Sequence, residues 1–208
     1  NLYQVVKKKI QNGQKKIIVV VSAMSGVTNK LVHEYKKIDK EINNPEYDVI
    51  LSTGEQYSCA LISTFLNKRG INSRSILGWQ IPINTDDRYS KSRIENINSS
   101  ELKKNLKKFD VLVVAGFQGV SSENRITTLG RGGSDTTAVA LSVALKSKIC
   151  EIYTDVEGIY SADPRLVKGA KKIKNITYEE ILEMAALGSK VLHPRSVELA
   201  MKYDINIH

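Results

Sequence analysis

The stretch TTLGRGGSDTTA at residues 127–138 is the most informative part of the chain, because it joins a polar segment with β-strand character to an apolar helical segment. Its three glycines permit left-handed backbone and let an oxygen-rich ligand approach the main chain. Ser134 is predicted to cap the helix that follows, and a helix start attracts anions. Arg131 adds a cation there and Asp135 adds a carboxylate. The stretch therefore predicts a site for phosphoryl or carboxylate chemistry.

Outward from this stretch, short apolar runs alternate with helical patterns. Strands are predicted at residues 17–22, 73–77, 111–115 and 150–154, and a hairpin at residues 119–128. Helices are predicted at residues 27–42, 55–69, 100–107, 134–145, 178–187 and 194–203. Consecutive apolar positions are typical of strands buried on both faces. The alternation predicts an α/β domain with a mainly parallel sheet and helices on both faces.

Length and cysteine content limit the possibilities further. A chain of 208 residues is predicted to form one domain with a sizeable core. Cys59 and Cys150 lie far apart in apolar contexts, which predicts two buried thiols rather than a disulfide framework. The three histidines form no metal-ligand pattern. No apolar run approaches the ~20 residues that a membrane span needs.

The formal net charge is +9, which raises the possibility of a nucleic-acid-binding protein. The lysines are scattered or occur in short helical groups, and few aromatic residues accompany them. A solvated basic surface is the favoured interpretation. A basic nucleic-acid-binding domain remains the non-enzyme alternative.

Three further motifs extend the pattern: SAMSGVTN at residues 22–29, STGEQ at 52–56 and YTDVEGIYSADPR at 153–165. With the glycine-rich stretch they resemble the aspartate kinases of the amino acid kinase family, and the resemblance runs along nearly the whole chain. It implies a three-layer α/β sandwich of the carbamate kinase-like type. It also implies ATP- and magnesium-dependent phosphorylation of the side-chain carboxylate of L-aspartate, in a cytoplasmic homo-oligomer without specific nucleic acid or membrane partners.

The resemblance assigns roles to individual residues. The predicted catalytic residues are Asp135, which would organise the reacting groups, and Arg131, which would clamp the substrate's α-carboxylate. The implied substrate-binding residues are Ser22, Thr28, Glu55, Phe117, Arg131, Gly132 and Ser134, with Glu55 holding the amino group. The implied nucleotide-binding residues are Thr154, Asp155, Tyr160, Arg165, Lys190 and Val191. No metal ligand is predicted, because magnesium is expected to bind through the ATP phosphates.

Aspartate kinases begin with a strand ending in Lys-Phe-Gly-Gly-Thr-Ser, which holds the ATP phosphates, and this motif has no counterpart here. Residues 1–208 are therefore expected to form a catalytic domain without its first strand and glycine loop, and without the regulatory domains that commonly follow. Another amino acid kinase acting on a carboxylate or phosphate acceptor is the alternative within the family. A dinucleotide-binding G-x-G-x-x-G after the first strand and a P-loop are both missing.

Overall fold

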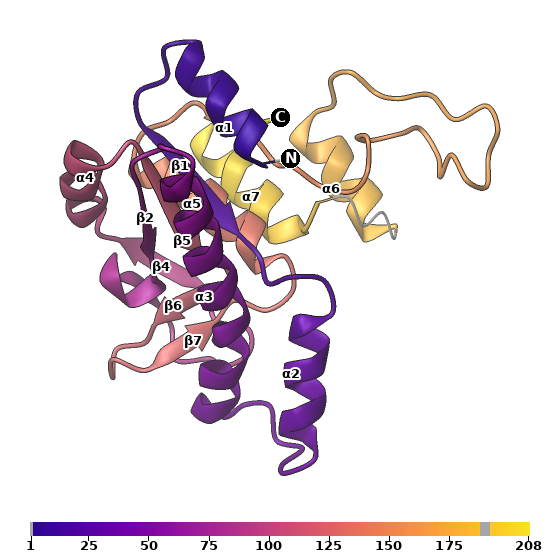
Figure 1. Ribbon diagram of the computed structural model, residues 1–208. Coiled ribbons are helices and arrows are strands. Elements are labelled where there is room, and N and C mark those ends of the chain that lie inside the picture. The colour runs from indigo at the N-terminus through magenta and orange to yellow at the C-terminus, as the bar shows by residue number, and fades with distance from the viewer. Residues whose placement is uncertain (1, 188–191) are drawn as a thin grey trace.

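The structure is a computed structural model that describes residues 2–187 and 192–208. Its centre is a parallel sheet of β1 (Ile17–Val21), β5 (Val111–Ala115) and β2 (Ser73–Ile76), in the order β1-β5-β2 (Figure 1). The register pairs Val21 with Ala115, so β1 and β5 end side by side. The three strands match the sequence prediction closely.

The central strand β5 shows why the sheet is covered on both faces. All five of its residues are fully buried. Val111, Val113 and Ala115 pack with α1 (Leu2–Gln11) and α3 (Pro45–Lys68). Leu112 and Val114 pack with α4 (Ser99–Lys108) and α5 (Gly133–Ala144). Because side chains alternate across a strand, a continuous apolar run buries both faces. The predicted α/β sandwich is confirmed.

A second sheet has the order β4-β3-β6-β7 and contains β3 (Ile83–Thr85), β4 (Ile94–Ile97), β6 (Gln118–Val120) and β7 (Ile126–Thr128). The antiparallel pair β6–β7 confirms the predicted hairpin. The sequence did not predict β3, β4 or the short 3₁₀ helix at Gly78–Gln80. A Cβ at Gly119 would lie 2.4 Å from the Thr85 side chain, so this glycine lets β6 approach β3.

The helix and strand ends differ from the prediction in several places. The helix α3 begins at Pro45 after the Asn44 cap, not at residue 55, because Asn44 accepts a hydrogen bond from the Glu46 N–H and proline suits a first helical turn. The helix α5 begins at Gly133 with Gly132 as its cap, so Ser134 is not the cap. The helix α2 (Val27–Lys36) and strand β8 (Ile149–Cys150) are shorter than predicted.

The C-terminal part consists of α6 (Tyr178–Ala186), α7 (Pro194–Tyr203) and β9 (Asn206–Ile207). The strand β9 pairs in parallel with β8. A third apolar cluster joins Val139 of α5 to Cys150, Ala200 and Ile205. Both cysteines are free and buried, as predicted.

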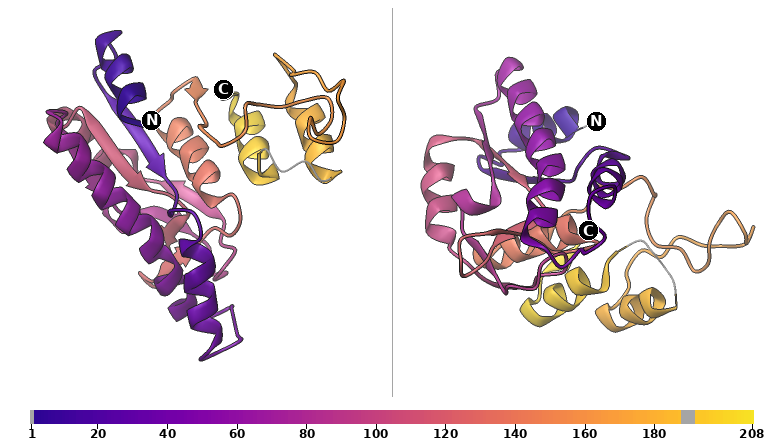
Figure 2. Two further views of the ribbon diagram at one scale, coloured as in Figure 1. Left: turned by 45° about the vertical axis from the view of Figure 1, so that its right-hand side comes forward. Right: turned by 90° about the horizontal axis from the view of Figure 1, so that it is seen from below.

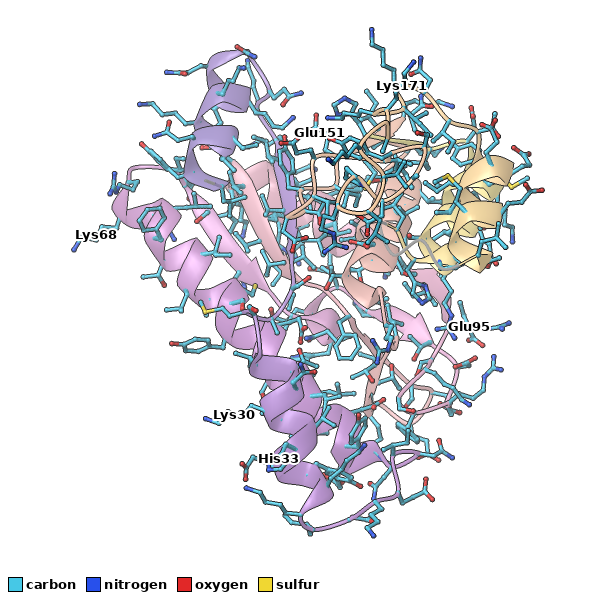
Figure 3. All side chains as sticks on the ribbon, turned by 90° about the vertical axis from the view of Figure 1, so that its right-hand side faces the viewer. Lys30, His33, Lys68, Glu95, Glu151 and Lys171 are labelled. Carbon is cyan, nitrogen blue, oxygen red and sulfur yellow. The ribbon has the colours of Figure 1, made fainter. Side chains whose placement is uncertain are left out.

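Two observations concern the surface. Figure 3 shows Lys30 and Lys68 projecting away from the body of the molecule, which suits the interpretation of a solvated basic surface. Across residues 2–187 and 192–208, no helix is both long enough and apolar enough to cross a membrane.

Candidate active site at the carboxyl ends of β1 and β5

A pocket of about 240 Å³ opens where β1 and β5 end. Open α/β sheets place ligands outside the carboxyl ends of their strands. The pocket brings together every residue that the sequence assigned to substrate binding or catalysis. Its lining is Ser22, Ala23, Thr28, Glu55, Phe117, Gly130, Arg131, Gly132, Gly133, Ser134 and Asp135. These residues come from four separate parts of the chain, so the fold rather than local sequence assembles the pocket.

Glu55 is the most informative side chain of this pocket. It is only 4 % exposed, and its Oε1 accepts a hydrogen bond of 3.0 Å from the Ala23 N–H. Its Oε2 is buried and has no hydrogen-bond partner among the described residues. Burial raises the pKa of the Glu55 carboxyl. A buried carboxylate oxygen without a donor is costly, so a cationic donor such as a ligand ammonium would be bound favourably here.

Packing, rather than a helix terminus, places Glu55. The residue lies in the middle of α3, so the predicted position in a first helical turn is wrong. Gly54 lets the helix approach the end of β1, since a Cβ there would lie 2.8 Å from the Ala23 Cβ. This close approach allows the Ala23 N–H to reach the Glu55 carboxylate.

The glycine-rich loop (residues 129–133) forms the opposite wall. Gly130 and Gly132 have φ values of 76° and 66°, in the left-handed region that glycine adopts readily. The first helical hydrogen bond of α5 runs from the Thr136 N–H to the Gly132 carbonyl. The turn therefore ends one residue earlier than predicted, and Ser134 and Asp135 lie in the first turn of the helix.

Arg131 and Asp135 supply the charges of this wall. Arg131 is exposed, and no ion pair to it occurs among the residues that the structure describes. Asp135 is partly buried, and this burial raises its pKa, while His193 acts in the opposite direction. A cation and a carboxylate thus flank one pocket together with Glu55. The arrangement suits the binding of a small zwitterion and the transfer of a charged group close to it.

Phe117 lines the pocket in an unusual conformation. Its φ is 69°, which is rare for a bulky residue and costs about 1–3 kcal/mol. Two contacts hold it: its N–H donates to the Thr137 hydroxyl oxygen, and its carbonyl accepts from the Leu129 N–H. Sequence reasoning missed Thr137, because nothing in its local pattern indicates a contact with residue 117.

The predicted nucleotide residues lie elsewhere. Thr154, Asp155 and Arg165 are exposed and Tyr160 is partly exposed in the long segment between β8 and α6. Figures 1 and 2 show this segment extending away from the sheets. Arg165 pairs with Asp163 at 2.9 Å, and the Tyr160 hydroxyl donates to Glu157. The structure does not bring this set into the pocket. Lys190 and Val191 lie outside the described residues.

His193 lies behind the glycine-rich loop. Its Nδ1 accepts a hydrogen bond from the Arg195 N–H at the start of α7, so His193 caps this helix. A Cβ at Gly132 would lie 2.2 Å from the His193 Cβ. The backbone of the loop therefore rests directly on this histidine.

We expect Gly132→Ala to destabilise the protein through both strain and collision. The left-handed conformation alone costs about 1–2 kcal/mol in a residue with a Cβ, and the contact with His193 adds to it. Gly13→Ala is the matched control, because Gly13 has a φ of 88° and nothing within 4 Å of a Cβ. Thermal unfolding should show a clearly larger loss for Gly132→Ala. Equal losses would mean that the loop moves away from His193 at no cost.

Comparison with known proteins identifies the family of this chain. The family model described as "Amino acid kinase family" matches residues 1–208. This chain belongs to the amino acid kinase family. An aspartokinase of Rickettsia felis is 51 % identical over 194 residues, which are 92 % of this chain and 48 % of the relative.

Solved structures of amino acid kinases agree in fold. The aspartate kinase from Synechocystis has a TM-score of 0.84 and 46 % identity, over 99 % of this chain and 34 % of that one. Aspartokinase III of E. coli, solved with aspartate and ADP, has a TM-score of 0.84 and 28 % identity. The match covers 99 % of this chain and 57 % of that one. The chain spans about half the length of the curated relatives that it matches.

Proposed function

We propose that this chain carries the catalytic domain of an aspartate kinase, which transfers the γ-phosphoryl group of ATP to the side-chain carboxylate of L-aspartate. The observation that carries the proposal is the buried Oε2 of Glu55, which has no hydrogen-bond partner among the described residues and belongs to a side chain lining the same pocket as Arg131 and Asp135. The names of the relatives support the choice of substrate. The product, aspartyl phosphate, would begin the route to lysine, threonine, methionine and diaminopimelate.

The pocket supplies complementary charges for the unreactive end of aspartate. The Glu55 carboxylate would accept the substrate ammonium, and the Arg131 guanidinium would hold the α-carboxylate through two parallel hydrogen bonds. Ser22, Thr28, Phe117, Gly132 and Ser134 line the remaining walls. Held at both groups, the substrate can present its side-chain carboxylate in only one direction.

The transfer step needs no strong base, since a carboxylate with a pKa of about 3.9 is already ionised near pH 7. A side-chain oxygen forms a bond to the γ-phosphorus while the bond to the bridging β–γ oxygen breaks, and ADP leaves with the electron pair. Catalysis then depends on in-line positioning and on stabilisation of charge. Asp135 would orient the cationic groups around the reacting phosphoryl group.

ATP is proposed to bind through Thr154, Asp155, Tyr160 and Arg165 and through Lys190 and Val191, with magnesium held by its phosphates. The side chains of Thr154, Asp155, Tyr160 and Arg165 are exposed or partly exposed, so a nucleotide could reach them. The aspartokinase III complex, which contains ADP and aspartate together, supports this two-substrate arrangement. A cytoplasmic homo-oligomer remains the proposed context.

The direct test is turnover by the full-length protein. With ATP and magnesium it should convert L-aspartate to an acyl phosphate that hydroxylamine traps as the hydroxamate. Glutamate, acetylglutamate, carbamate and uridylate are the competing acceptors, and preference for any of them would replace aspartate in the proposal. Salt-dependent binding to nucleic acid without turnover would favour the non-enzyme alternative.

Arg131→Lys tests the assignment of the α-carboxylate clamp. We expect the KM for aspartate to rise about tenfold or more, because lysine keeps the charge but cannot make the bidentate contact. The KM for ATP should change little. Arg125→Lys is the control, since Arg125 pairs with Glu46 outside the pocket. Equal rises in both KM values for Arg131→Lys would point to a general structural role.

A further inference from the structure

Asp48 is a buried carboxylate with no part in the proposed chemistry. It lies on α3 and is fully buried. Its oxygens accept hydrogen bonds from the Ser90 N–H at 2.9 Å, the Thr128 N–H at 2.6 Å and the Thr128 hydroxyl at 2.8 Å. No lysine, arginine or histidine forms an ion pair with it among the described residues. Keeping such a charge buried is costly.

The hydrogen-bond donors to Asp48 belong to residues that adjoin the glycine-rich loop. Thr128 is the last residue of β7, and Leu129 and Gly130 follow it directly. Ser90 belongs to the 86–92 loop and has a φ of 66°. Its carbonyl oxygen lies 3.2 Å from where a Cβ of Gly130 would be. Asp48 therefore holds both the start of the glycine-rich loop and the segment that packs against it.

Asp48 shares one face of α3 with Glu55. The positions 48, 52 and 55 have the i, i+4, i+7 spacing of a single helical face, and all three side chains are buried. Glu55 reaches the pocket directly. Asp48 reaches the base of the opposite wall through Thr128. One rigid helix thus sets the position of the two walls relative to each other.

We infer that Asp48 is a positioning residue, which fixes the glycine-rich loop so that Arg131 lies across the pocket from Glu55 at the distance that the substrate's two charged groups require. This inference rests on the proposed function for the identity of that substrate. A carboxylate offers two oxygens to these three donors. An amide has one oxygen, so the Ser90 and Thr128 N–H groups would have to share it, and the Thr128 hydroxyl would have to turn and accept from the NH₂ group.

Burial also disfavours the charged form of Asp48. Burial raises the pKa of Asp48 to about 6, against the effect of its hydrogen bonds. Burial raises the pKa of Glu55 as well. A pH profile of aspartate binding would therefore mix the two carboxyl groups, and substitutions distinguish them better.

The test compares Asp48→Asn, Thr128→Val and the double variant in the full-length protein. Thr128→Val removes one hydrogen bond without changing the shape of the side chain greatly, so it serves also if Asp48→Asn does not fold. We expect each substitution to raise the KM for aspartate about tenfold and to leave the KM for ATP within about twofold. Because the two residues act through one contact, the double variant should lose less than the product of the single effects.

Ser63→Ala is the matched control. Ser63 is a buried polar residue of the same helix, and its hydroxyl contacts Ser73 of β2 at 3.2 Å, away from the pocket. It should lower the Tm without altering the KM for aspartate. If Asp48→Asn and Thr128→Val behave like Ser63→Ala, or raise both KM values equally, the positioning role is overturned.

A measurement without substrate separates this inference from the proposed function. Amide hydrogen exchange of residues 129–135, followed by mass spectrometry, should become faster in Asp48→Asn and Thr128→Val but not in Ser63→Ala. If these variants exchange faster but the protein does not turn over aspartate, the assignment of aspartate as the substrate is overturned and the positioning role is supported. Unchanged exchange in an active aspartate kinase would overturn the positioning role alone.

Discussion

Asp135→Asn should reduce kcat on the order of 100-fold, a loss typical of removing one electrostatic contact to a transition state. The substitution keeps the size of the side chain and removes its charge. Burial raises the pKa of the Asp135 carboxyl, so a neutral amide is tolerated by the fold and the Tm should not fall. The decrease should appear equally in kcat and kcat/KM, since the interaction is made in the transition state.

Steady-state kinetics of the full-length enzyme would measure this effect. Asp110→Asn is a suitable control, because Asp110 is a partly exposed residue that pairs with Lys16 at 3.3 Å outside the pocket. Near-normal turnover of Asp135→Asn would reject its catalytic assignment. A higher KM for aspartate at unchanged kcat would make Asp135 a binding residue instead.

Glu55→Gln should raise the KM for aspartate about 10- to 100-fold. The amide can still accept the hydrogen bond from the Ala23 N–H, but it presents an NH₂ group where Glu55 presents the unpaired Oε2. A charge-assisted hydrogen bond contributes about 1.5–3 kcal/mol, and each 1.4 kcal/mol corresponds to about a tenfold change in affinity. Calorimetric titration with aspartate would measure the loss directly.

The same substitution should stabilise the protein without substrate. Burial raises the pKa of Glu55 above the ordinary value of 4.5, so the folded state binds this proton more tightly than the unfolded state does. The stability that Glu55 contributes is therefore greatest below pH 4.5 and falls as the pH rises through the raised pKa. The gain in Tm from Glu55→Gln should grow over the same pH range.

Glu101→Gln is the control for this prediction, since Glu101 is a partly exposed residue of α4 that pairs with Lys104. It should change neither the affinity for aspartate nor the pH dependence of the Tm. A lower Tm for Glu55→Gln at neutral pH would contradict the view that the buried carboxylate is held at a cost in stability.

Local signals in the sequence were sufficient for some elements and insufficient for others. The run VLVVA at residues 111–115 predicted a buried parallel strand correctly, because five consecutive apolar residues leave no solvent face. The strand at residues 83–85 was missed, because its central residue is polar and its contacts come from distant parts of the chain. The start of α3 was placed ten residues late, although Asn44 and Pro45 are strong signals for a helix start.

The sequence by itself determined the α/β class, the family resemblance and the residue types of the pocket, because apolar periodicity and glycine-rich turns are local properties. Only the tertiary structure decided that one Glu55 oxygen has no hydrogen-bond partner among residues 2–187 and 192–208, that Asp48 accepts hydrogen bonds from Thr128 and that Gly132 packs against His193. Each of these facts depends on contacts between segments more than 30 residues apart. Burial and hydrogen-bond partners arise when such segments pack together, so the chemistry of the buried carboxylates appears only in the folded chain.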